Sequence, residues 1–83
     1  MEIRYSTDAQ AFYVMLGQGE IARTAHISDD VMVDLEANGA VHGIELLCTP
    51  GELSEEERTR LIEQFPVAGE ALAAIERLTG LSA

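Results

Sequence analysis

Hydrophobic and polar positions alternate most regularly between Val31 and Leu47, in the segment VMVDLEANGAVHGIELL. Two alternating runs flank Asn38-Gly39, and this dipeptide between such runs is a strong signal for a β-hairpin with a two-residue loop. A shift of one residue would bury the acids and expose the valines, so the pattern selects one register strongly. The predicted pairs are Leu35 with His42, Val33 with Ile44 and Val31 with Leu46 on an apolar face, and Glu36 with Val41, Asp34 with Gly43 and Met32 with Glu45 on the other.

The first part of the chain predicts three further strands before this hairpin. Ile3 and Tyr5 alternate with Glu2 and Arg4, a wholly apolar run follows at 11–16, and a third strand is expected at 21–27. The turns between successive strands are short, which favours an antiparallel meander. The run 11–16 is apolar on both of its faces, so we expect both to be covered, one by helices and the other by a second subunit.

The turn at Asp29-Asp30 leaves two alternatives open for the strand before it. A two-residue loop there would place His26 and Thr24 in the core. An odd-length loop would bury Ile27, Ala25 and Ile21 instead, and it hides more apolar surface, so it is preferred. That choice places His26 on the acidic face, diagonal to Asp34.

The second part of the chain predicts two helices. Ser54-Glu55-Glu56-Glu57 matches the capping box that opens a helix, and Pro66 suits the first position of the next one. Gly80 is a plausible C-terminal stop. The first helix is expected to have an apolar stripe of Leu61, Ile62 and Phe65. The stripe of the second is Ala68, Ala71, Leu72, Ile75 and Leu78. This second stripe either packs on the sheet of its own chain or forms a dimer contact.

Together these elements predict one α+β domain over residues 1–83, an antiparallel meander of four to five strands followed by two C-terminal helices packed on one face. The sheet part spans 1–48 and the helical part 52–80. A chain of 83 residues buries a marginal core, so self-association into a dimer or higher oligomer is expected.

Charge narrows the range of partners. The formal net charge is −10, from 15 acidic residues against five arginines and no lysine. Such a surface disfavours nucleic acid and anionic membranes, whereas a basic protein partner or a cation is compatible with it. The longest wholly apolar run, 11–16, is far too short to span a bilayer, and a cytoplasmic location is expected. The single Cys48 excludes an intrachain disulfide and is expected to be a buried, unreactive thiol.

The predicted register gathers the candidate chemistry on one face of the sheet. His26, Asp34, Glu36 and Glu45 form a candidate divalent-metal or acid–base site, because carboxylate and imidazole groups suit such ions. A solvated acidic face is the competing interpretation, and it is favoured. Gly43 marks either an opening for a ligand or a close contact within the sheet. His42 is expected on the core side, partly buried with a local hydrogen bond. No catalytic residue and no cofactor is predicted.

Residues 1 to about 48 resemble the domain of unknown function family 2283, a family of small bacterial proteins. The resemblance is carried by Tyr5, AFYVML at 11–16, VDLEANG at 33–39 and GIELL at 43–47. The chain departs from the family pattern at Gln10 and at Glu36, where an aspartate is usual. The resemblance implies a small β-sheet domain, with the helical tail after Pro50 as an addition. It implies no activity, cofactor or catalytic residue.

These observations favour a non-enzymatic, homo-oligomeric module that binds another protein. One alternative is a divalent-metal or small-ligand binding protein or enzyme that uses the acidic face. The other is an antitoxin-like protein that neutralises a basic partner by charge.

Overall fold

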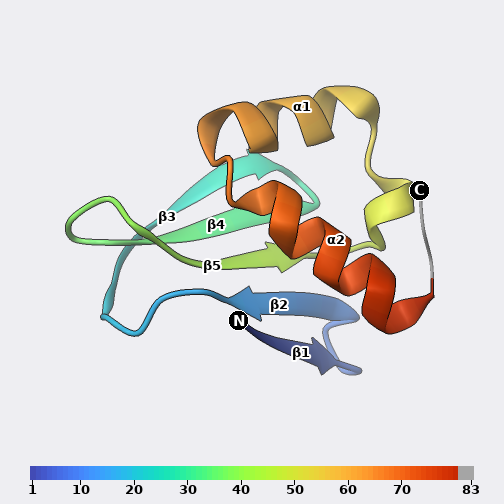
Figure 1. The fold of residues 1–83 in the computed structure, drawn as a ribbon, viewed down its shortest axis with the longest axis horizontal. Helices are drawn as coiled ribbons and strands as arrows, with labels where there is room; N and C mark the ends of the chain where they lie inside the picture. The colour runs from blue at the N-terminus through green and yellow to red at the C-terminus, as the bar shows by residue number, and fades with distance from the viewer. Residues whose placement is uncertain (81–83) are drawn as a thin grey trace.

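The computed structural model describes residues 1–80, which form one antiparallel sheet with two helices on one side of it (Figure 1). The predicted α+β class is confirmed. Within residues 1–80, neither helix has the length and hydropathy needed to cross a lipid bilayer. The elements are β1 (Glu2–Ser6), β2 (Ala11–Met15), β3 (Ile21–Ser28), β4 (Val31–Glu36), β5 (Val41–Leu46), a 3-10 turn η1 (Pro50–Glu52), α1 (Glu55–Gln64) and α2 (Ala68–Thr79).

The strand order is β1-β2-β5-β4-β3, which differs from a simple meander. Strand β2 pairs with β5, and the connection from β2 to β3 therefore passes the ends of β5 and β4 (Figure 1). This order places the two strands with the strongest alternation, β4 and β5, in the interior of the sheet. Their inward side chains then have neighbours on both sides, which increases the apolar surface that the sheet buries.

The hairpin of β4 and β5 keeps most of its predicted register, although the turn itself differs. Asp34 pairs with Gly43 as predicted, as do the three pairs beyond it toward Val31. Glu36 N donates to Ala40 O at 2.9 Å, so the loop contains the three residues between them. Gly39 N closes the turn by donating to Glu36 O at 2.9 Å, and only Gly39 of the Asn38-Gly39 step has positive φ. The predicted pairs Leu35 with His42 and Glu36 with Val41 are wrong. A bulge at His42 on β5 compensates for the longer loop and restores the register.

The hairpin of β3 and β4 has the same kind of compensation. Its loop, Asp29-Asp30, has two residues, so the preferred odd-length loop is wrong. A bulge at Ile27 nevertheless turns Ile27 and Ala25 toward the core, as that alternative predicted. Ile21 is the exception: a second irregularity places it opposite Glu36, where it is half exposed.

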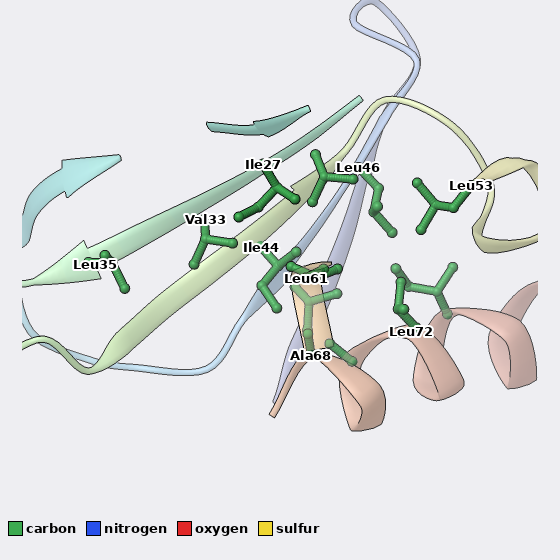
Figure 2. Close-up of a cluster of buried hydrophobic side chains, with 13 residues drawn as sticks. Ile27, Val33, Leu35, Ile44, Leu46, Leu53, Leu61, Ala68 and Leu72 are labelled. Atoms are coloured by element: carbon green, nitrogen blue, oxygen red, sulfur yellow. The ribbon is translucent and has the colours of Figure 1, made fainter. Parts of the chain in front are cut away.

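The hydrophobic core lies between the sheet and the helices (Figure 2). Val33 and Ile44 project from adjacent strands toward Leu61 of α1 and Leu72 of α2. Most of the predicted stripe of α2 is buried against its own chain, which settles the alternative left open for that helix. The buried members are Ala68, Ala71, Leu72 and Ile75, whereas Leu78 is exposed, contrary to the prediction.

Helix α1 begins with the predicted capping box. The Ser54 hydroxyl accepts from Glu57 N at 3.0 Å, and the Glu57 carboxylate accepts from Ser54 N at 2.9 Å. The same carboxylate accepts from the Ser28 hydroxyl at 2.6 Å, which joins the start of α1 to the end of β3. Helix α2 begins at Ala68, two residues after the predicted Pro66, and ends at Gly80 in the left-handed conformation.

Glu57→Gln tests the junction between α1 and β3. Hydrogen bonds from Ser28 and then from the Ser54 amide lower the pKa of Glu57. In the unfolded chain the pKa of this carboxyl group is about 4.3. The stabilisation that it gives the folded state is therefore present above that pH and is lost as the pH falls through the lower pKa of the folded state. In urea unfolding at a series of pH values, the variant should be less stable than wild type at neutral pH, and the difference should close below about pH 4.

Glu55→Gln is the control, since it removes the same charge from the same helical turn. Its pH dependence should be flatter than that of Glu57→Gln. A stability difference for Glu57→Gln that stays constant down to acidic pH would contradict this role of Glu57.

Candidate functional site

Within residues 1–80, one face of the sheet has no covering helix, because α1 and α2 both lie on the opposite side (Figure 1). The alternation of β4 shows this directly: Val31, Val33 and Leu35 are buried, and the residues between them are only partly buried. We call the other side the open face. Its side chains belong to Glu2 and Arg4 on β1, Tyr13 and Met15 on β2, His42 and Glu45 on β5, Met32, Asp34 and Glu36 on β4, and Thr24 and His26 on β3.

Tyr13 crosses the open face over a glycine. Its cross-strand neighbour on β5 is Glu45, yet its hydroxyl donates to Asp34 Oδ2 on β4 at 2.7 Å. This reach is possible because Gly43 lies between them, and a Cβ at Gly43 would overlap the Tyr13 hydroxyl and ring. The strand glycine therefore marks a close contact within the sheet, one of the two interpretations of Gly43 that the sequence left open.

Asp34 is satisfied from both sides. Its second oxygen, Oδ1, accepts from the Thr24 hydroxyl on β3 at 2.6 Å. Burial, and then the hydrogen bond to Asp34, raise the pKa of Tyr13 well above its usual value. The phenol is therefore a fixed donor at neutral pH, and one carboxylate joins β2, β4 and β3 across the intervening β5.

Glu36 forms the second polar contact of the open face. Its Oε2 accepts from Gly19 N at 2.9 Å and lies 3.0 Å from His42 Nδ1. The side chains of His42 and Glu36 are only 12% and 16% exposed. Gly17 and Gly19 pass so close that a Cβ at either would crowd the Glu36 carboxylate. Glu36 thus holds the connection between β2 and β3 against the sheet.

The bulge on β5 explains the position of His42. It was predicted on the core side beside Leu35, and this is wrong, because the extra residue turns its ring toward Glu36 on the open face. Its partial burial and its local hydrogen bond agree with the prediction. The carbonyl of His42 accepts from Leu16 N and Gly17 N, at 2.8 and 3.0 Å, which anchors the end of β2.

The predicted candidates lie on the same face but do not converge on one point. His26 is exposed opposite Met32 and diagonal to Asp34, as expected. Glu45 lies between Tyr13 and Met32, while Asp34 and Glu36 are bonded to separate sets of donors. Within residues 1–80, no group of three or more His, Cys, Asp or Glu side chains is placed to hold a metal ion.

Sequence reasoning missed Tyr13 and Thr24, the two donors to Asp34. The partner strand of β2 was unknown, so nothing placed Tyr13 near Asp34. The glycine in β5 was the available signal, because a glycine opposite a carboxylate leaves room for a side chain from the strand beyond.

A shallow hollow of about 470 Å³ lies on the open face near β1 and β2, with Arg4, Ala11, Tyr13 and Glu45 in its wall. Arg4 is held by Glu2 at 2.7 Å. Glu45 has no hydrogen bond or ion pair to any residue in the part of the chain that the structure describes. Its carboxylate is therefore available to a group from outside the chain.

Comparison with known proteins gives one result. The family model described as "Protein of unknown function (DUF2283)" matches residues 2–48, more than half of the chain. This range contains all five strands and every residue of the open face, whereas both helices lie outside it. No curated protein and no solved structure matches the chain.

Gly43→Ala tests the crossing of Tyr13. The new methyl group has to displace the Tyr13 ring, so we expect a loss of about 1–3 kcal/mol in the free energy of unfolding. In a Tyr13→Ala background the same substitution should be neutral or stabilising, since alanine restricts the unfolded chain more than glycine does. A thermodynamic cycle from chemical denaturation measures this coupling, and equal effects of Gly43→Ala in the two backgrounds would contradict it.

Glu36→Ala tests the attachment of the connection between β2 and β3. The substitution removes the acceptor of the Gly19 amide but leaves the acceptor of the Gly17 amide, which is the carbonyl of His42. Hydrogen exchange followed by NMR should show faster exchange at Gly19 with little change at Gly17. Glu45→Ala, on the same face, is the control and should change neither. Unchanged protection of Gly19 in Glu36→Ala would show that Glu36 does not hold this segment.

Proposed function

Because the chain belongs to the DUF2283 family of proteins of unknown function, its role has to be inferred from its own surface, and we propose that it is a non-enzymatic protein-interaction module. In this proposal the open face binds a basic segment of a partner protein. The observation that carries the proposal is that both helices cover the same side of the sheet and leave acids and methionines on the other.

The composition of the open face supports protein binding. Met15 and Met32 are partly buried, and methionine adapts its shape to different partners. Half-exposed Ile21 adds apolar surface at the β3 side. Apart from the shallow hollow beside Tyr13, the open face is built from side chains of all five strands, and an extended surface of this kind is suited to another protein.

Charge supports a basic partner. The chain carries −10 in total, and the unpaired carboxylate of Glu45 lies at the rim of the hollow beside the Tyr13 ring. An arginine or lysine side chain placed there can form an ion pair with the Glu45 carboxylate and a cation–π contact with the Tyr13 ring. The antitoxin-like role is one form of this proposal, in which the basic partner is a toxin.

The state of the polar groups favours binding over catalysis. Asp34 and Glu36 accept hydrogen bonds from within the chain, so they serve to order the face. Cys48 is partly buried against the core, and burial is the main cause that raises its pKa to about 11. Its thiol is protonated at neutral pH and weakly nucleophilic.

Charge reversal at Glu45 tests the partner and its site together. Tagged wild type and Glu45→Lys are expressed in the native host, and the captured proteins are quantified by mass spectrometry. Glu63→Lys is the matched control, since it makes the same charge change on an exposed position of α1. Wild type and Glu63→Lys should enrich a common basic protein, and Glu45→Lys should lose most of it.

Two results would contradict the proposal. One is a captured set that is unchanged by Glu45→Lys. The other is a rise in melting temperature with Mg²⁺, Mn²⁺ or Zn²⁺ that Asp34→Asn abolishes, because an ion that binds only the folded state must stabilise it. The second result would favour the cation-binding alternative.

A further inference from the structure

Strand β1 forms an open edge of the sheet and borders the molecule in Figure 1. Its five residues pair with β2 in a regular register without a bulge, and it contains no proline. Edge strands in monomeric proteins are usually blunted by bulges, prolines or covering segments, because unpaired backbone groups invite another strand. Within residues 1–80, no strand pairs with the outer side of β1, and its two charged side chains, Glu2 and Arg4, are of opposite sign.

The other edge, β3, is protected. Two irregularities interrupt its pairing with β4, and bulges of this kind twist an edge away from a neighbouring strand. Arg60 of α1 donates to the carbonyl of Ile27 near its end. The two edges are therefore unequal, and β1 is the one suited to pairing.

Large apolar side chains are exposed along the β1 edge. Met1 is 63% exposed and Tyr5 is 52% exposed, both on the helix side of the sheet with Ile3 between them. Tyr5 also contacts the ring of Phe12, with centroids 4.8 Å apart, so its orientation is set by the core. Exposed apolar groups gathered along an unpaired edge favour an interface there.

We propose that two copies of the chain pair through β1, antiparallel and centred on Ile3, to make one continuous sheet of ten strands. In this register Glu2 of each copy faces Arg4 of the other, and Met1 faces Tyr5. The strand is complementary to itself: opposite charges meet on the open face, and apolar groups meet on the helix side. The proposal goes beyond partner binding and does not depend on it.

Neighbouring registers are excluded by charge. Centring the pair on Arg4 puts the two guanidinium groups opposite each other, and centring it on Glu2 does the same to two carboxylates. Like charges at directly opposed positions are destabilising. The strand itself carries one acid and one base, so it is a locally neutral place for two copies of net charge −10 to meet.

A groove on the helix side receives the partner's side chain. It is lined by Met1 together with Gly69, Glu70, Ala73 and Arg77 of α2. Because the partner's Tyr5 lies opposite Met1 in the proposed register, its ring is placed at this groove. Contact with the Met1 thioether suits an aromatic ring, and the small side chains on α2 leave space for it.

Charge exchange tests the register. In sedimentation experiments wild type should form dimers at micromolar concentration. Arg4→Glu and Glu2→Arg should each raise the dissociation constant by about tenfold or more, because each replaces two attractive pairs with repulsive ones. The Glu2→Arg/Arg4→Glu double variant should restore the dimer, and so should mixing the two single variants, since the heterodimer pairs only opposite charges.

Arg23→Glu on β3 is the matched control, because it makes the same charge change on the other edge, and it should leave the dimer intact. In a Cys48→Ser background, Ile3→Cys should form an intermolecular disulfide, since directly opposed residues lie at a suitable distance, and Tyr5→Cys should not. Wild type that stays monomeric throughout the micromolar range, or equal effects of Arg4→Glu and Arg23→Glu, would overturn the proposal. Failure of the dimer would leave the capture experiment on Glu45 unaffected.

Discussion

The open face depends on the pair of hydrogen bonds that the Asp34 carboxylate accepts. The donors are the hydroxyls of Tyr13 on β2 and Thr24 on β3. The Tyr13 hydroxyl reaches Asp34 because Gly43 of β5 has no side chain in its way. Because two donors fix this carboxylate, the side of the sheet opposite the helices is polar and ordered without a further layer of structure over it. The second apolar side of β2 is accordingly occupied within the chain, since the Tyr13 ring lies across the sheet. That side of β2 alone therefore does not require a second subunit.

The faces of the strands were predictable because burial dominates the energy of the register. Val33 opposite Ile44 is the case in point, since the pair was predicted through a two-residue turn that does not exist. The loop is one residue longer, and the bulge at His42 absorbs the difference. Between β3 and β4 the loop has two residues where an odd number was expected, and the bulge at Ile27 again turns the apolar side chain inward. The free energy of burying aliphatic side chains is larger than the preference for a particular turn, so burial decides which side chains face the core.

Prediction failed where no large burial energy was involved, or where the contact joined distant parts of the chain. Ile21 lies at the end of an edge strand, so an irregularity there costs little and leaves it half exposed. Tyr13 meets Asp34 because β2 lies beside β5, and periodicity within a segment carries no information about the strand that will lie beside it. The same gap explains why nothing in the sequence places Gly17 and Gly19 around Glu36.

The helices and the sheet have separate roles in this arrangement. The helices close one side and are joined to the sheet through Glu57 and the core, while the other side and the β1 edge remain accessible. The order of the open face depends on Tyr13 lying over Gly43. NMR tests this most directly, through the chemical shifts of the Gly43 Hα protons and their NOEs to the Tyr13 ring. The account predicts strong NOEs and a ring-current shift that disappears in Tyr13→Ala. Gly43 Hα protons with no NOE to Tyr13 and no change in that variant would contradict it.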